Sequence, residues 1–211
     1  MVILGLTGSI GMGKSVAADM FRRQGAAVFD ADAAVHQFLD CGGAAVSTVE
    51  AAFSGSAEET RSGPQINRAA LARRVLGDRA EMQRLEEILH PLVRNAETQF
   101  LSCASARRVR LIVLDVPLLY ETGGDRRCDA VAVVWVPPFV QVQRVLRRSG
   151  MTPALLAAIR TRQIPVNDKL LRADFMIPTG VGRAAALRHV RRIVKILSHR
   201  RGRRWPFRPR P

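Results

Sequence analysis

Residues 8–15 read Gly-Ser-Ile-Gly-Met-Gly-Lys-Ser and match the phosphate-binding loop pattern G-x-x-x-x-G-K-[ST] in full. An apolar run at residues 2–6 precedes this loop, and residues 14–23 carry apolar side chains near helical spacing. The sequence therefore predicts a strand, a glycine loop and a helix. In such a loop, consecutive backbone N–H groups and the positive end of the helix point at phosphate oxygens. A glycine-rich turn that merely joins strand to helix is the alternative, and it leaves the Lys-Ser pair unexplained.

Two side chains of this loop have expected roles. Lys14 is expected to reach the β- and γ-phosphates of a nucleotide, and the Ser15 hydroxyl is expected to coordinate Mg²⁺. Residues 167–169 read Asn-Asp-Lys, which is the wrong order for the Asn-Lys-x-Asp segment of guanine-specific GTPases. RecA-like motors usually need a longer chain. A small phosphotransferase remains as the interpretation.

Strand-like apolar runs alternate with helical patterns along the chain, which predicts a doubly wound α/β fold with a parallel sheet. The stretch after the second strand candidate has almost no strand pattern. We expect helices there, with a loop at residues 54–63 and a long helix from residue 78 to about residue 104. The expected strands are residues 2–6, 26–29, 109–116, 130–136 and 175–177, and the last expected helix is residues 183–197.

This pattern predicts one P-loop kinase domain over residues 1–198. An acceptor-binding helical insertion is expected over about 31–105 and an arginine-rich lid over about 138–166. Residues 199–211 form a Pro/Arg tail without a core-forming period, for which we expect disorder. The core is expected to comprise residues of about 1–30, 106–137 and 174–198.

The charge of the chain is concentrated at its C-terminal end. The formal net charge is +15 over 211 residues, and the last 29 residues hold ten Arg and one Lys with no acid. The remainder is nearly balanced, so nucleic-acid binding by the tail is a lesser alternative to a solvated tail. No apolar run approaches a membrane span, and the three separated cysteines form no zinc motif. We therefore expect a cytoplasmic protein without a membrane partner.

Four acidic or basic side chains outside the loop are candidates for the site. Asp30 and Asp32 follow a predicted strand, and one could act as general base for an acceptor hydroxyl; the alternative is that one of them caps the next helix. Asp115 ends another predicted strand, where it either holds the metal through water or starts a turn before Pro117. His90 precedes Pro91 in a helical context and either touches the acceptor or is structural.

Six segments together resemble the dephospho-coenzyme A kinase family, in that family's order and approximate spacing. The combination of the phosphate loop with the DAD, HP and DVPLL motifs makes the resemblance specific, and it covers the chain from Leu4 to about Leu197. The segments are LGLTGSIGMGKS (4–15), VFDADAAVHQ (28–37), ILHPLVR (88–94), LDVPLLYETG (114–123), CDAVAVVWV (128–136) and RQIPVNDKLLRADFMI (162–177).

The resemblance implies ATP-dependent phosphorylation of the ribose 3′-hydroxyl of dephospho-coenzyme A, the last step of coenzyme A synthesis. It also implies a P-loop kinase core of five parallel strands, flanked by helices, with a helical acceptor domain and a mobile lid. The family's proposed base falls on Asp32. The nucleotide loop falls on Gly11, Met12, Gly13, Lys14, Ser15 and Val16, and the residues expected at the substrate are Asp30, His90, Asp115 and Leu118.

The chain departs from the family pattern at two places. Val16 replaces a frequent Thr, which the mechanism tolerates because Ser15 is the expected metal ligand. Residues 178–180 read Pro-Thr-Gly where the family tends to have Asp-Asn before a glycine, so Thr179 occupies the place of that Asn. In the lid, Arg144, Arg147 and Arg148 are candidate clamps for the transferring phosphate, with the first two expected at ATP; a solvated helix face is the alternative for each.

Overall fold

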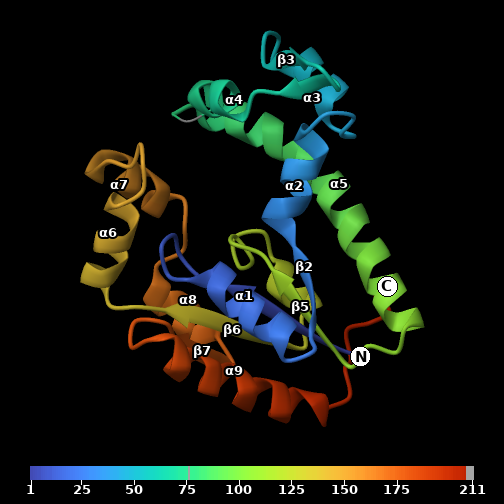
Figure 1. Cartoon of the computed structure of the whole chain (residues 1–211), viewed down its shortest axis with the longest axis vertical. Helices are drawn as coiled ribbons and strands as arrows, with labels where there is room; N and C mark the ends of the chain where they lie inside the picture. The colour runs from blue at the N-terminus through green and yellow to red at the C-terminus, as the bar shows by residue number, and fades with distance from the viewer. Residues whose placement is uncertain (76, 208–211) are drawn as a thin grey trace. The chain divides into compact units, whose positions relative to one another are not determined.

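The computed structural model describes residues 1–75 and 77–207 of the chain, so the last four residues of the expected tail lie outside the described residues. The chain divides into two compact units. The first comprises Met1–Phe29 and Cys103–Pro211, and the second comprises Asp30–Ser102. Figure 1 labels most of their elements.

A five-stranded parallel sheet forms the centre of the first unit, as the sequence predicts. The strand order is β2-β5-β1-β6-β7, and β1 is parallel to both of its neighbours. Every residue of β1 is buried, which is why this strand is a continuous apolar run rather than an alternating one. The strands are β1 (Val2–Thr7), β2 (Ala27–Asp30), β5 (Leu111–Asp115), β6 (Ala130–Trp135) and β7 (Phe175–Pro178).

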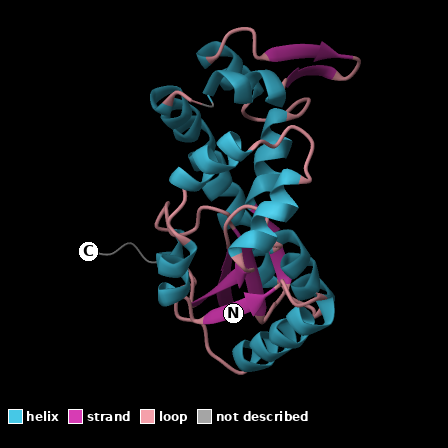
Figure 2. Ribbon diagram, turned by 90° about the vertical axis from the view of Figure 1, so that its left-hand side faces the viewer, coloured by secondary structure: helices cyan, strands magenta, loops and turns pink. Residues whose placement is uncertain are grey.

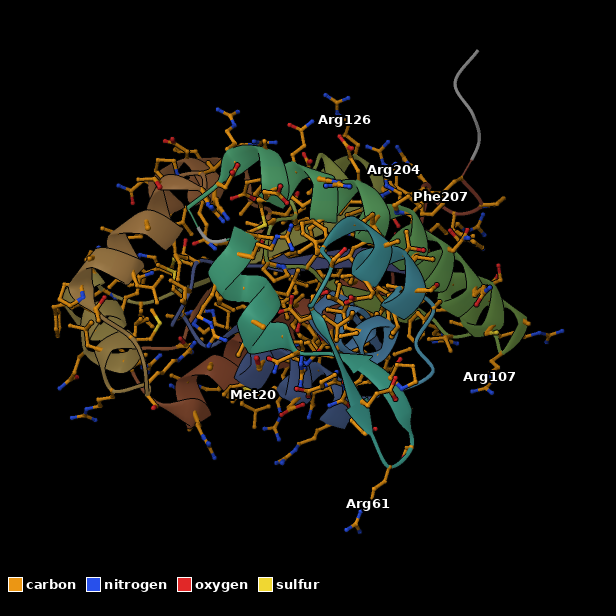
Figure 3. All side chains as sticks on the ribbon, turned by 90° about the horizontal axis from the view of Figure 1, so that it is seen from above. Met20, Arg61, Arg107, Arg126, Arg204 and Phe207 are labelled. Atoms are coloured by element: carbon orange, nitrogen blue, oxygen red, sulfur yellow. The ribbon has the colours of Figure 1, made fainter. Side chains whose placement is uncertain are left out.

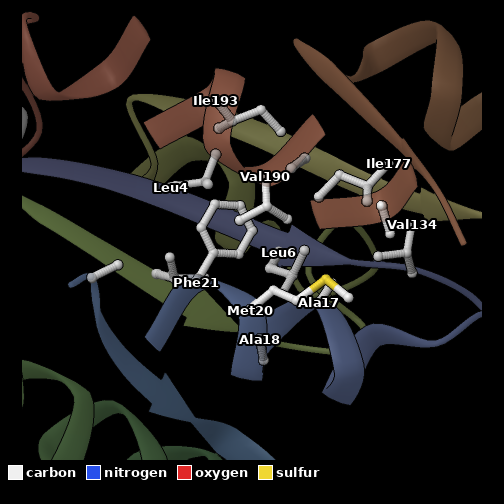
Figure 4. Packing of buried hydrophobic residues seen from close by; sticks show 14 of the residues in the cluster. Leu4, Leu6, Ala17, Ala18, Met20, Phe21, Val134, Ile177, Val190 and Ile193 are labelled. Carbon is white, nitrogen blue, oxygen red and sulfur yellow. The ribbon is translucent and has the colours of Figure 1, made fainter. Parts of the chain in front are cut away.

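Helices cover the sheet (Figure 2). Two of them, α1 and α9, pack against each other. Their apolar faces meet alternate side chains of β1 in one core: Figure 4 shows Phe21 of α1 with Val190 of α9 and Leu4 of β1. This packing fixes the N-terminus of α1 at the end of the phosphate loop. The helices of this unit are α1 (Lys14–Arg23), α6 (Pro138–Leu146), α7 (Pro153–Thr161), α8 (Val166–Arg172) and α9 (Arg183–Ser198), with a 3₁₀ turn η1 (Gly124–Arg127).

The second unit is mostly helical, and it contains one β-hairpin where the sequence predicts a loop. Strands β3 and β4 pair antiparallel, and the amide of Gln65 donates to the Glu58 carboxylate across the pair at 2.8 Å. The loop expectation was wrong because cross-strand polar pairs stabilise this short hairpin without an apolar alternation. The elements are α2 (Ala31–Leu39), α3 (Val46–Ala52), β3 (Ala57–Thr60), β4 (Gly63–Ile66), α4 (Arg68–Val75) and the long α5 (Arg79–Ala106).

One carboxylate fastens the end of α3 to this hairpin. Glu50 accepts hydrogen bonds from the backbone N–H groups of Gly55 and Ala57 at 2.7 and 2.6 Å. These backbone donors stabilise the charged form, so the pKa of Glu50 lies below its ordinary value. The second unit has its own apolar core, in which Val49 and Phe53 are fully buried.

The described part of the expected tail, residues 199–207, lies at the amino end of the central strands. Backbone N–H groups of Arg203 and Arg204 donate to the Asp129 carboxylate at 2.6 and 3.1 Å. Over these residues the structure differs from the expected disorder, because Asp129 directly precedes β6 and holds the segment there. Within the described ranges, no helix combines the length and apolar character needed to cross a membrane.

Candidate active site

The phosphate loop joins the end of β1 to the start of α1, as the sequence predicts. Gly13 immediately precedes the helix with a φ of 86°, a left-handed conformation that favours glycine. A Cβ atom at Gly13 would also lie 3.0 Å from the hydroxyl oxygen of Thr179. Glycine is therefore needed here for both the turn and the close approach. The helix that follows directs its first N–H groups toward the loop.

Lys14 and Asp115 form an ion pair beside the loop. The Lys14 Nζ lies 2.7 Å from the Asp115 Oδ1, and the Asp115 side chain is only 1% exposed. The sheet explains the pairing, because Asp115 ends β5 next to Leu6 of the neighbouring parallel strand. The sequence offered a metal contact or a turn for Asp115 and did not predict this ion pair.

Thr179 connects the end of β7 to the phosphate loop. Its hydroxyl donates to the carbonyl oxygen of Met12 at 2.6 Å, and its own N–H donates to the carbonyl oxygen of Trp135 at 2.9 Å. The guanidinium of Arg144 donates to the Thr179 carbonyl oxygen at 2.9 Å. Thr179 therefore holds both the loop and one of the predicted lid arginines. Sequence reasoning marked this position only as a departure from the family pattern.

A cavity of about 380 Å³ adjoins the loop. It combines cationic side chains with apolar ones, which suits a ligand that carries both phosphates and a flat ring. Arg144 and Arg148 contribute to it, whereas Arg147 is exposed at the end of α6 and does not line it. The lining residues are Gly11, Gly13, Val16, Met20, Arg144, Arg148, Thr179, Gly182, Arg183 and Ala186.

Two glutamines from the predicted lid contact the backbone of the loop. The Gln141 amide in α6 donates to the Ile10 carbonyl oxygen at 2.7 Å, and the Gln163 carbonyl accepts from the Ile10 N–H at 3.4 Å. Arg160 of α7 in turn donates to the Gln141 side chain. The sequence did not predict these three residues as part of the site, because a Gln or Arg in a basic helical segment belongs to no distinctive motif.

The second unit contains Asp30 and Asp32, which have different surroundings. Asp30 ends β2 and caps α2, its Oδ1 accepting from the Ala33 N–H at 3.0 Å. Asp32 is exposed in the first turn of α2. The helix begins at Ala31, so Asp30 precedes it and Asp32 lies within its first turn. Capping therefore falls to Asp30 and leaves Asp32 as the candidate base.

The remaining predicted site residues lie in a helix and a turn. His90 is half-buried in α5, which continues through Pro91. Leu118 is half-buried in the turn that follows β5, and its carbonyl oxygen accepts from the Thr122 hydroxyl at 2.9 Å. Ser15 and Val16 are exposed in the first turn of α1.

A parallel sheet with a phosphate loop between β1 and α1, a Lys–Asp pair beside it and an arginine-lined cavity define a P-loop kinase. Comparison with known proteins gives the family. The dephospho-CoA kinase family model matches residues 2–182. A dephospho-CoA kinase of Rhodospirillum rubrum is 56% identical over 190 residues, which cover 90% of this chain and 89% of the relative. The chain belongs to the dephospho-CoA kinase family.

Solved structures share the fold of this chain. A protein of Thermus thermophilus named TT1252 superposes with a TM-score of 0.76 at 29% identity, covering 92% of this chain and 96% of that one. A dephospho-CoA kinase from Campylobacter jejuni superposes with a TM-score of 0.62 at 21% identity, with the same coverage of both chains, and supports the fold. A dephospho-CoA kinase of Paramagnetospirillum magneticum is 53% identical over 169 residues, 80% of this chain and 78% of the relative.

Proposed function

We propose that this protein transfers the γ-phosphoryl group of ATP to the ribose 3′-hydroxyl of dephospho-coenzyme A, giving coenzyme A and ADP in the cytoplasm. The observation that carries the proposal is the Lys14–Asp115 pair at a complete phosphate loop, in a chain of the dephospho-CoA kinase family. The phosphate loop is the proposed nucleotide site. Dephospho-coenzyme A is proposed as the acceptor because the chain belongs to this family.

The nucleotide is proposed to bind with its phosphates on the loop and its ring toward the 380 Å³ cavity. Lys14 then exchanges the Asp115 carboxylate for the β- and γ-phosphates, which carry more negative charge. Arg144 and Arg148 approach the same cavity from α6 and its end. Arg147, exposed and outside the lining, takes part only if the lid moves.

The residues at the loop fit a Mg²⁺ ion that is held together with the nucleotide. Among residues 1–75 and 77–207, no group of three or more His, Cys, Asp or Glu could hold a metal unaided. Mg²⁺ usually keeps several waters and binds one or two protein oxygens plus substrate phosphates, so one hydroxyl suffices. Ser15, exposed beside Lys14, would supply that oxygen. The ion would neutralise phosphate charge during transfer.

Asp32 is proposed as the general base. It accepts the proton of the 3′-hydroxyl while the ribose oxygen bonds to the γ-phosphorus and the bond to the β-phosphate oxygen breaks, releasing ADP. Asp32 has an exposed side chain in the first turn of α2, and Asp30 caps the same helix through its Oδ1. Asp30, His90, Asp115 and Leu118 are proposed to contact the acceptor.

The segment of residues 138–166 is proposed to act as a lid. Gln141 of α6 and Gln163, two residues beyond the end of α7, contact the backbone of Ile10, so a change at the loop on nucleotide binding reaches α6 and the end of α7. Closure would bring arginines to the phosphates and exclude water from the reaction.

The proposal is tested by the choice of acceptor. ADP release is measured with ATP and Mg²⁺ and, in turn, dephospho-coenzyme A, nucleoside monophosphates and free nucleosides. We expect dephospho-coenzyme A to give a kcat/KM at least a hundredfold above the others. A preference for nucleosides or nucleotides would replace the proposal with the alternative, a P-loop kinase for another hydroxyl acceptor.

A further inference from the structure

The C-terminal segment, residues 199–207, is built into the first unit rather than merely attached to it. The Asp129 carboxylate accepts from the backbone N–H groups of Arg203 and Arg204 through one oxygen and from that of Ile3 through the other. A Cβ atom at Gly202 would lie 1.7 Å from the carbonyl oxygen of Met1, so the two backbones touch. Because these contacts use backbone groups, they leave the arginine side chains available for a ligand.

Two adjoining cavities lie along this segment, with volumes of about 630 and 430 Å³. Arg203 lines both cavities, and we treat their linings together as one candidate surface. Asp129 is the one acid among the described residues that line it, and backbone N–H groups occupy both of its oxygens. Figure 3 shows Arg126 and Arg204 on the same side of the molecule. The arginines that line the surface are Arg126, Arg127, Arg200, Arg201, Arg203 and Arg204.

Aromatic rings lie among these arginines. Trp205 and Phe207 pack edge to face with ring centroids 5.1 Å apart, and the Arg127 guanidinium lies 6.0 Å from the Phe207 centroid. Both rings are half-buried, which holds them in place and leaves part of each exposed. Fixed rings beside guanidinium groups are the arrangement on which unpaired bases stack while their phosphates meet positive charge.

We propose that this surface, defined by the six arginines with Trp205 and Phe207, binds single-stranded nucleic acid. Six guanidinium groups carry more positive charge than the phosphates of one mononucleotide can neutralise, which favours a strand with several phosphates. The rings favour unpaired bases, because the bases of a duplex are stacked on each other. The surface lies at the amino end of β1, and the phosphate loop follows its carboxyl end. The six residues of β1 span about 20 Å, so nucleic acid bound at this surface does not compete with ATP at the loop.

The charge contribution is tested with the full-length protein and fluorescent 15-nucleotide oligo(U) and oligo(dT), by fluorescence anisotropy at 50–300 mM salt. Arg203→Gln with Arg204→Gln removes two cations but keeps both backbone donors to Asp129. Each phosphate contact contributes about 0.7 to the slope of log K against log salt, so we expect the slope to fall by about 1.4. Arg61→Gln with Arg107→Gln is the matched control, since both side chains are exposed and neither lines either cavity. An equal decrease of this slope in the two double variants would overturn the proposal.

Two further variants separate a built surface from a flexible charged tail. Gly202→Ala keeps the charge and blocks docking against Met1, so we expect at least a tenfold weaker affinity; unchanged affinity overturns the assembled surface. Trp205→Leu is expected to weaken binding about tenfold through lost stacking. If inorganic polyphosphate binds as tightly as oligo(U) and Trp205→Leu has no effect, base recognition is overturned. Circular dichroism checks that each variant folds, and ADP release checks that its turnover is unchanged. The relative affinity of oligo(U) and oligo(dT) shows whether RNA or DNA is preferred.

Discussion

The Thr179 hydroxyl donates to the Met12 carbonyl oxygen at 2.6 Å, which ties the residue after the last strand to the middle of the phosphate loop. The same residue accepts from Arg144 through its carbonyl oxygen. One threonine thus fixes the loop that holds the phosphates and an arginine that lines the adjoining cavity. The geometry of the loop depends on a segment 167 positions away in the chain.

Replacing Thr179 with Val keeps the shape of the side chain. It removes the hydrogen bond that the hydroxyl donates to Met12 and the longer one, 3.4 Å, that it accepts from Arg144. A net hydrogen bond contributes about 0.5–1.5 kcal/mol, so we expect kcat/KM for ATP to fall about three- to tenfold. Steady-state kinetics measure this fall. Thr98→Val, which removes a comparable hydroxyl bond within α5, is the control and should leave the KM for ATP unchanged. Equal behaviour of the two variants would show that Thr179 does not position the loop.

Because Lys14 and Asp115 form an ion pair, we expect a substitution of Asp115 to change the effect of a Lys14 substitution on stability. Lys14→Met is expected to lower the rate of phosphoryl transfer about 10²–10³-fold, since one donor to the transferring group is lost. It also leaves a buried Asp115 carboxylate without its ammonium partner, so the melting temperature should fall. Adding Asp115→Asn should restore the melting temperature and leave the rate low. Single-turnover kinetics and calorimetry measure the two effects, and full recovery of the rate would refute the role of Lys14 at the phosphates.

Asp30 and Asp32 provide a matched pair for separating catalysis from capping. Asp32→Asn is expected to lower kcat about 10²–10⁴-fold at an unchanged melting temperature, as loss of a general base does. Asp30→Ala is expected to lower the free energy of unfolding by about 1 kcal/mol, because it removes the cap on α2. Turnover assays and denaturant unfolding give both quantities. Wild-type turnover in Asp32→Asn would exclude it as the base.

Much of the fold could be predicted from the sequence because its signals are local. The loop from Gly8 to Ser15 fixes β1 and α1, and the apolar runs at β5 and β6 mark buried parallel strands. The hairpin at Ala57–Thr60 and Gly63–Ile66 could not be predicted, since it depends on polar pairs across the strands.

The sequence predicted the site residues that belong to a short local motif. It did not predict contacts between residues that are far apart in the sequence. Lys14 meets Asp115 because β1 and β5 are neighbours in the sheet. Thr179 and Met12 are in contact although 167 positions separate them in the sequence. Lys169 is fully buried beside Glu121 at 2.7 Å, although a lysine in a basic helix is expected at the surface. Such contacts arise only when the strands are placed side by side.

Tyr120 gives a prediction in the alkaline range. Burial raises its pKa to about 12, since the charged phenolate loses its hydration, although the Arg172 guanidinium 4.2 Å from its ring centroid opposes this. Tyr120 is the chain's single tyrosine, so absorbance near 295 nm reports it alone. We expect a midpoint near pH 12 in the folded protein and near pH 10 in denaturant.

The same shift has a consequence for stability. Between pH 10 and 12 the unfolded chain loses the Tyr120 proton while the folded protein keeps it, so the free energy of unfolding should decrease as the pH rises. Tyr120→Phe should remove this part of the dependence and keep the ring beneath Arg172. Identical pH profiles for the two proteins, measured by denaturant unfolding, would contradict the shift.

The most direct measurement of the proposed reaction is the position of the transferred phosphate. The purified protein is incubated with ATP, Mg²⁺ and dephospho-coenzyme A, and ³¹P NMR of the product locates the new phosphoester. In parallel, an analogue that lacks the ribose 3′-hydroxyl replaces the acceptor. Our account predicts a 3′-phosphomonoester from the first acceptor and no acceptor-dependent ADP release with the analogue. Phosphorylation at another oxygen, or equal ADP release with the analogue, would contradict it.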